Sequence, residues 1–312
     1  MSERINKTGD HNGKEGERSV KISGSGRVTG GDFDSVSISG SGVVSGANVK
    51  SIKINGSGRV EGFGSEGGES RNAKTARSAT INGSGVIAGG TYSTVSIHGS
   101  GTITSDLVCD MLNISGSGKV QGKVRCENAG ISGSGTVDGD LQSITLSVNG
   151  STSFQSSVSC TNLDVAGSAC IRSNLNAQSV KVTGKVTVGG DCSAERFFAE
   201  GTFDVGGLLN ADEIDIRLHS AKSRAKEIGG ERITVTRGLR SGLLRALVGL
   251  GFTPRLEAEL IEGNEISLEN TTAKVVRGGD IVLGKGCDIG LVEYTGTLRM
   301  TEDAKCAEQK KV

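Results

Sequence analysis

The sequence predicts an all-β protein, a single-stranded parallel β-helix built from coils of 16–17 residues. Three observations favour this solenoid. A six-letter phrase recurs at a nearly fixed step, apolar residues occupy fixed positions within each repeat, and the composition is unusual. Of the 312 residues, 50 are Gly and only 3% are aromatic. A compact globular core draws more of its buried area from aromatic side chains, whereas a stacked repeat array does not need them.

The repeated phrase defines the coil. SISGSG at 37–42 returns as KISGSG at 21–26, KINGSG at 53–58, NISGSG at 113–118 and GISGSG at 130–135. Its first glycine, here called the anchor glycine, recurs at 24, 40, 56, 83, 99, 116, 133, 150, 167, 184 and 201. These positions differ by 16 or 17, except for one step of 27 between Gly56 and Gly83. The longer step predicts an exposed loop inserted at 63–76.

Apolar residues stand at three fixed distances from the anchor. The positions two before, four before and four after it are apolar in every repeat, and the residues between them are mostly polar. Alternation at period two with many β-branched residues predicts half-buried strands. One coil cannot bury its apolar face alone, so successive coils must stack in register. We expect the glycines at the corners because they tolerate positive φ or close backbone approach.

The predicted solenoid spans residues 20–300. Residues 1–19 and 301–312 are polar and are predicted to be an N-terminal and a C-terminal tail. The solenoid carries two predicted interruptions, the loop at 63–76 and a segment outside the repeat at 238–259.

The segment 238–259 allows one short amphipathic helix near 239–252. Two interpretations remain open. The helix packs on the flank of the solenoid, or it contacts a membrane surface or a partner, as Arg240 and Arg245 would favour on an anionic bilayer. The residues of this candidate contact are Leu243, Leu244, Leu247, Val248, Leu250 and Phe252.

The sequence gives little sign of catalysis. No catalytic, cofactor-binding or metal-binding motif is present, so we expect no enzyme activity, cofactor or metal. Cys109, Cys126 and Cys160 each follow an anchor by ten residues. We expect them to be small buried apolar residues. The alternative is a bridge or metal pair between Cys109 and Cys126 on adjacent coils. His98 lies in an outward column, where a surface ladder is expected, and Asp138 is expected at a solvated turn.

The balance of charges and the cysteine content restrict the binding partners and the cellular compartment that we expect for the chain. Lys and Arg total 35 and Asp and Glu total 35, so nothing attracts the chain as a whole to nucleic acid. Seven Cys without a signal peptide fit a reducing cytosol. We therefore expect a cytoplasmic protein, with the inner face of the membrane as an alternative location.

Several segments resemble the bactofilins, bacterial cytoskeletal proteins that form polymers. The resemblance covers about residues 20–300 and is carried by VSISGSGVVSG, GLLNADEIDIRL, KEIGGERITV and LIEGNEISLENTTAKVVRGGDIVLGKGCDIGLVEYTGTL. It implies a right-handed β-helix, nucleotide-independent assembly end to end, and scaffold roles in cell shape, envelope organisation or motility. It implies as partners further copies of the chain, a paralogous bactofilin, or envelope and motility proteins.

The stacked architecture favours assembly on physical grounds as well. A stack ends in unpaired strand edges and an uncovered core, which other solenoids cap. The residues expected at these polymerisation ends are Val20, Ile22 and Val28, and Val292, Tyr294 and Leu298. The sequence therefore predicts a non-enzymatic cytoskeletal scaffold. The alternatives are an adhesin-like or other solenoid binding module that does not polymerise, and a β-helical carbohydrate-active enzyme.

Overall fold

The computed structural model describes residues 19–61, 77–219, 221–238 and 254–312, and in these ranges it contains β-strands and no helix. The fold is a parallel β-solenoid of about 15 turns with coils of about 17 residues, which confirms the predicted fold class. The helix expected near 239–252 lies outside the described residues. The chain divides into two compact units. Unit 1 comprises Met1–Ile144 and Asn149–Gln155, and unit 2 comprises Thr145–Val148 and Ser156–Val312.

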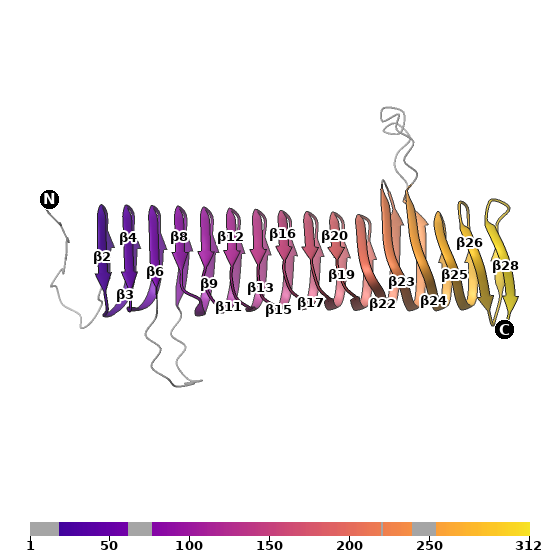
Figure 1. Ribbon diagram of the computed structural model, residues 1–312, viewed down its shortest axis with the longest axis horizontal. Coiled ribbons are helices and arrows are strands. Elements are labelled where there is room, and N and C mark those ends of the chain that lie inside the picture. Colours follow the sequence, from indigo (N-terminus) through magenta and orange to yellow (C-terminus); the bar gives the residue numbers. More distant parts are fainter. Residues whose placement is uncertain (1–18, 62–76, 220, 239–253) are drawn as a thin grey trace, which may run out of the picture. The chain divides into compact units, whose positions relative to one another are not determined.

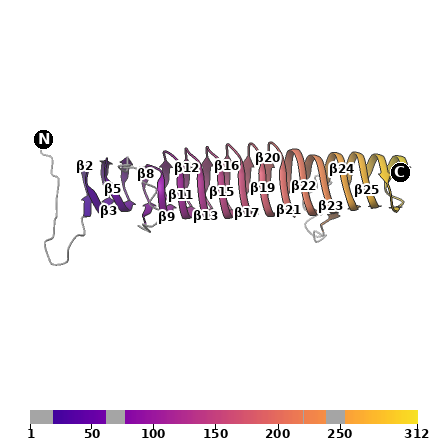
Figure 2. The same ribbon diagram turned by 90° about the horizontal axis from the view of Figure 1, so that it is seen from below.

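Each coil of unit 1 combines two strands, one of four or five residues and one of four to eight residues. In Figure 1 the short strands β2, β4, β6 and β8 lie side by side, and Figure 2 shows the longer strands β9, β11 and β13 in the same arrangement. The short strands are β2 (Ser25–Thr29), β4 (Ser41–Ser45), β6 (Ser57–Glu61), β8 (Ser84–Ile87), β10 (Ser100–Ile103), β12 (Ser117–Val120), β14 (Ser134–Val137) and β16 (Ser151–Phe154). The others are β1 (Ser19–Ile22), β3 (Asp32–Ile38), β5 (Asn48–Ile54), β7 (Ser78–Ile81), β9 (Gly90–Ile97), β11 (Leu107–Ile114) and β13 (Val124–Ile131), and β15 (Leu141–Val148) belongs partly to each unit.

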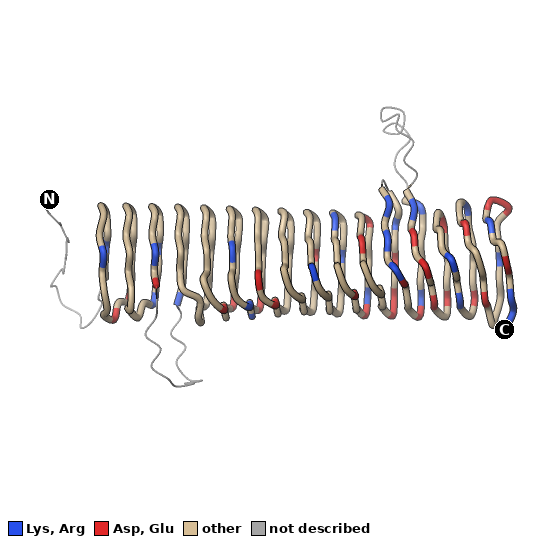
Figure 3. The backbone as a smooth tube through the Cα atoms, in the orientation of Figure 1, with Lys and Arg blue, Asp and Glu red and all other residues tan. Residues whose placement is uncertain are grey.

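Unit 2 begins with the same alternation and then changes. From β22 to β25 one long strand supplies both sides of the coil, as when β22 pairs with β20 and with β21. The next coil is split again, because β25 pairs with both β26 and β27. The strands are β17 (Val158–Val165), β18 (Ser168–Ile171), β19 (Leu175–Val182), β20 (Lys185–Val188), β21 (Cys192–Ala199), β22 (Thr202–Leu218), β23 (Lys222–Arg237), β24 (Arg255–Leu268), β25 (Thr271–Leu283), β26 (Asp288–Tyr294), β27 (Leu298–Met300) and β28 (Lys305–Lys311). Figure 3 shows Lys, Arg, Asp and Glu spread densely over β22 to β28 and sparsely over the strands of unit 1.

The core is formed by the predicted apolar columns. Ile97, Ile114 and Ile131 pair in register on successive parallel strands, and each is at most 1% exposed. Stacking identical branched side chains at the strand spacing of about 4.8 Å buries them against one another. The columns derived from the anchor glycines are therefore correct.

Beyond the first coil, anchor glycines such as Gly116 are required by close backbone approach and not by positive φ. The described glycines with positive φ are Gly30, Gly31, Gly46, Gly90 and Gly286, none of which is an anchor. A Cβ on the anchor Gly116 would collide with the carbonyl oxygen of Gly99 in the preceding coil, and Gly133 stands in the same relation to Gly116. Of the two reasons expected for glycine, positive φ and close backbone approach, only close approach applies to these anchor positions.

Two predicted boundaries are wrong. The expected C-terminal tail 301–312 contains β28, which pairs with β26 through Asp288↔Lys305 and Tyr294↔Lys311. A polar strand is stable there because its backbone groups bond to a strand already in place. The interruption 238–259 is also too long, because Arg255 already begins β24 and pairs with Lys222 of β23.

Candidate functional site

Among the described strands, the N-terminal edge of unit 1 ends the stack without a further strand partner. Among the described residues, β1 pairs only with β3 and β2 only with β4, so each keeps one edge unpaired. Val20 and Val28 are half-buried and Ile22 is 7% exposed, whereas their in-register partners in the next coil are at most 1% exposed. The three predicted residues therefore lie together on an apolar edge.

Gly24 shows which way a side chain introduced at this edge would point. A Cβ built on Gly40 would strike the carbonyl oxygen of Gly24, and one built on Gly56 would strike that of Gly40. The Cβ direction of an anchor glycine therefore points toward the preceding coil. At Gly24 the same construction meets nothing within 4 Å. A side chain introduced at Gly24 would project out of the N-terminal edge without disturbing the described coils.

The C-terminal edge of unit 2 differs from the prediction. Val292 is fully buried, because β28 covers it and places Gln309 in its column. Tyr294 and Leu298 are half-buried, and Tyr294 lies beside Lys311 of β28. Val292 is therefore not an end residue. The sequence did not predict that β28 buries Val292, because β28 carries Cys and Gln in columns where earlier coils carry Ile and Val.

A charged ladder stabilises the coils next to this edge. Glu293 accepts hydrogen bonds from Arg277 at 2.9 Å and from Lys310 at 3.4 Å. These bonds lower the pKa of the Glu293 carboxyl below its usual range. Arg232 and Glu265 form a further rung of the same kind at 3.0 Å. Alternating charges on in-register strands favour this pairing over a shifted one.

The candidate membrane contact remains a prediction. Its residues lie between 239 and 253, outside the described residues. The described part of the chain contains no helix with the length and apolarity that crossing a membrane requires.

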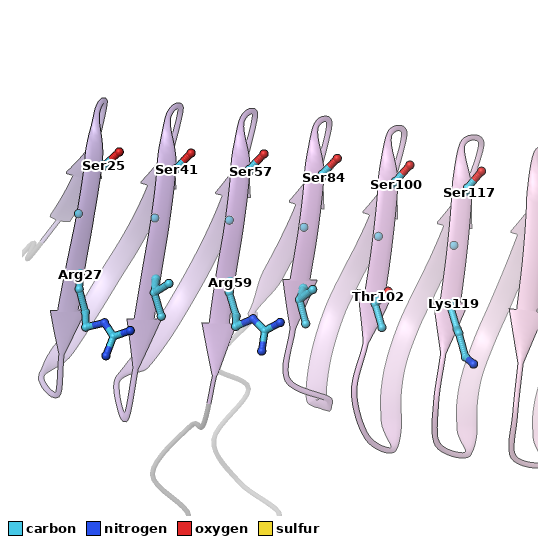
Figure 4. Close-up of a pocket in the computed structure, with 18 of the residues that line it drawn as sticks. Ser25, Arg27, Ser41, Ser57, Arg59, Ser84, Ser100, Thr102, Ser117 and Lys119 are labelled. Atoms are coloured by element: carbon cyan, nitrogen blue, oxygen red, sulfur yellow. The ribbon is translucent and has the colours of Figure 1, made fainter.

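A shallow groove of about 910 Å³ runs over the short strands of unit 1 (Figure 4). One side is a row of Ser hydroxyls that includes Ser25, Ser41 and Ser57. The opposite row includes Arg59, which pairs with Glu61 at 2.8 Å, and Lys119, which pairs with Asp138 at 3.0 Å. Two cationic side chains of the groove, Arg59 and Lys119, are therefore in ion pairs. Asp138 was expected only to face solvent, but it also pairs with Lys119.

The inward cysteines form part of one column. Cys109 pairs in register with Tyr92 on one side and with Cys126 on the other. A hydrogen bond between the two thiols lowers the pKa of Cys126 and raises that of Cys109, which burial raises further. Burial alone raises the pKa of Cys160 to about 12. All three are free and buried, as expected of small apolar residues, and the two candidates for a bridge are neighbours.

The remaining polar candidates form side-chain hydrogen bonds between neighbouring coils. The ring of His98 hydrogen-bonds the Ser115 hydroxyl at 2.8 Å, and Asn82 donates to Asn55 at 2.7 Å in the same outward column. The predicted surface ladder is confirmed. Within the described ranges, no group of three or more His, Cys, Asp or Glu is arranged to hold a metal ion.

Two curated relatives match part of the chain. A stretch of 89 residues is 48% identical to the uncharacterized protein YhbE of Bacillus subtilis (strain 168), and covers 28% of this chain and 36% of that protein. A stretch of 87 residues is 44% identical to the uncharacterized protein YhbF of the same organism, and covers 28% of this chain and 34% of that protein. The match therefore spans about a third of each relative's length. No family model and no solved structure matches the chain.

Proposed function

We propose that the chain is a non-enzymatic, bactofilin-like scaffold that self-assembles end to end into filaments without nucleotide. The observation that supports this most is the N-terminal edge of unit 1, where Val20, Ile22 and Val28 surround unpaired strand edges in the described residues. An edge with free backbone donors and acceptors accepts another strand. Burying the adjoining apolar residues would add to the free energy of that contact.

The C-terminal edge of unit 2 offers a second, more polar contact. β27 and β28 have no further strand partner among the described residues. Leu298 and Met300 are half-buried there, and Lys305 and Lys310 are exposed. We expect contacts at this edge to weaken with salt more than contacts at the N-terminal edge, because charges contribute more to them.

The cellular role is proposed from the resemblance alone. The partners would be further copies of the chain, a paralogous bactofilin, or envelope and motility proteins, in the cytoplasm or at the inner face of the membrane. The processes served would be cell shape, envelope organisation or motility.

The sharpest test places a charge on the N-terminal edge without changing the core. Gly24→Glu directs a carboxylate out of this edge and would bury it in any joint made there, at a high cost. The matched control is Ser41→Glu, which adds the same charge at an exposed position on the side of the stack. Sedimentation velocity and negative-stain electron microscopy would measure assembly, and circular dichroism would verify folding.

We expect Gly24→Glu to fold and to form only short oligomers, and Ser41→Glu to assemble as the wild type does. Filaments of wild-type length from a folded Gly24→Glu variant would exclude a joint at the N-terminal edge. Equal loss of assembly in both variants would indicate a lateral contact.

The groove of unit 1 favours one second candidate, a binding module that does not polymerise. It would present its row of Ser hydroxyls to an extended polar ligand. A chain that stays monomeric at all concentrations would favour this alternative. The carbohydrate-active enzyme has less support, because acidic residues such as Asp138 and Asp140 pair with lysines.

A further inference from the structure

Two thiols lie side by side in unit 1 and have no role in the proposed assembly. Cys109 on β11 and Cys126 on β13 are direct in-register partners of neighbouring parallel strands. Both face inward but keep contact with solvent, at 5% and 6% exposure, whereas Cys192 is 0% and Cys287 2% exposed. They are thus an in-register cysteine pair and are slightly less buried than Cys192 and Cys287.

The register meets the geometric requirement of a disulfide. Neighbouring strands are about 4.8 Å apart, and disulfides join Cα atoms about 4.4–6.8 Å apart with Cβ atoms about 3.5–4.5 Å apart. Only a small approach of the two side chains is needed to bond the sulfurs. We propose that Cys109 and Cys126 form a dithiol–disulfide pair that covalently links two successive coils of unit 1.

Cys126 is the thiol that attacks first. The in-register Cys109 thiol lies beside it and can donate a hydrogen bond to its thiolate. Ser143 follows Cys126 by one coil, as the hydrogen bonds from Arg125 to Gln142 indicate. The Ser143 hydroxyl is buried and has no hydrogen-bond partner in the described part of the chain. It can therefore donate to a thiolate at Cys126 without losing another bond.

The oxidant is a low-molecular-weight disulfide, written RSSR. The Cys126 thiolate attacks one sulfur of RSSR, which forms a mixed disulfide and releases one thiolate RS⁻. The Cys109 thiolate then attacks the Cys126 sulfur, which forms the Cys109–Cys126 bond and releases the second RS⁻. The two protein thiols lose two electrons, RSSR gains them, and the two thiol protons end on two molecules of RSH.

Other cysteines serve as controls within the same molecule. Cys160 occupies the corresponding position in its coil and is 8% exposed, but its in-register partner in unit 2 is Ala177. Cys170 is exposed and pairs in register with Thr187. We expect Cys170 to form a stable mixed disulfide and Cys160 to gain no bridge.

The test is oxidation of the folded, full chain with glutathione disulfide, followed by alkylation of free thiols, proteolysis and mass spectrometry. We expect a Cys109–Cys126 cross-linked peptide and loss of three of the seven alkylatable thiols, two to the bridge and one to the mixed disulfide at Cys170, with full reversal by dithiothreitol. The bridge should also raise the thermal unfolding midpoint, because it closes a loop in the unfolded chain.

Variants that lack one cysteine test which thiol attacks the oxidant first. Cys109→Ala should trap glutathione on Cys126, and Cys126→Ala should leave Cys109 reduced. Cys160→Ala is the matched control and should form the bridge like the wild type. Wild-type protein in which Cys170 carries glutathione while Cys109 and Cys126 both remain alkylatable would overturn the proposal. A cross-link found only between molecules would overturn it as well.

Discussion

At the scale of single residues, two neighbouring core positions of the repeat compensate for each other in size. Where the side chain at one position is larger, the side chain at the other is smaller. In unit 1 an Ile stands four residues before the second glycine of the phrase, and a Cβ added at Gly118 would lie 2.8 Å from the Cδ1 of Ile114. In unit 2 the corresponding pairs are Val165 with Ala169 and Ala199 with Phe203, all at most 2% exposed. A larger residue at one position accompanies a smaller one at the other, as dense packing requires.

This exchange predicts a rescue by a second substitution. Gly118→Ala should reduce the free energy of unfolding by about 1–3 kcal/mol, because the new methyl group overlaps Ile114. Adding Ile114→Val should recover part of the loss, since it removes Cδ1 but keeps Cγ2, which also lies 2.8 Å from the added Cβ, and it reproduces the natural combination at Val165 and Ala169. Urea denaturation of the two single variants and the double variant measures the coupling. Strictly additive losses would show that the two side chains do not share this space.

At the scale of strands, backbone pairing and charge ladders hold segments that the apolar pattern misses. β28 places Cys306 and Gln309 in columns where β26 has Ile289 and Val292. The pattern of apolar residues therefore predicted a tail. The start of β24 was missed because its charged residues, such as Glu257 and Glu259, are outward partners of lysines in the neighbouring strands. In both places the fold is fixed by contacts between coils, and a single stretch of sequence does not contain them.

The ladder at Glu293 predicts a pH dependence of the last strand. Its pKa is lowered in the folded protein, so the ionised carboxylate favours folding above the pKa of the unfolded chain, about 4.5. This contribution is lost as the pH falls through the lowered value. Hydrogen exchange of β28 amides should therefore be slower in the wild type than in Glu293→Gln at pH 7. The difference should shrink as the pH falls below the ordinary glutamate value, and a difference that does not change with pH would contradict the proposed role of the carboxylate.

The insertion at 63–76 should be dispensable for folding. β6 and β8 pair directly through Ser57↔Ser84 and Val60↔Ile87, although a step of 27 residues separates them. Deleting 11 residues from the insertion restores the 16-residue step and leaves both partners in place. We expect thermal unfolding midpoints within a few degrees of each other for the deletion variant and the wild type. A large drop would mean that the inserted residues stabilise the coils.

At the scale of the whole molecule, the repeat predicted the fold class and most of the core. Every strand pair of unit 1 follows the 16- or 17-residue step apart from the insertion, and column residues such as Ile114 and Val120 are buried as expected. The candidate ends were predicted less well. Their apolar residues could be read from the columns, but the burial of Val292 and the outward direction at Gly24 depend on how neighbouring strands lie.

The central claim is that this chain is a filament-forming scaffold, and the most direct measurement is the size of the purified wild-type chain as a function of its concentration. Sedimentation velocity, with negative-stain electron microscopy of the same samples, should reveal filaments that lengthen with concentration and do not respond to added nucleotide. A chain that remains monomeric throughout the range, with no filaments in the micrographs, would contradict the claim.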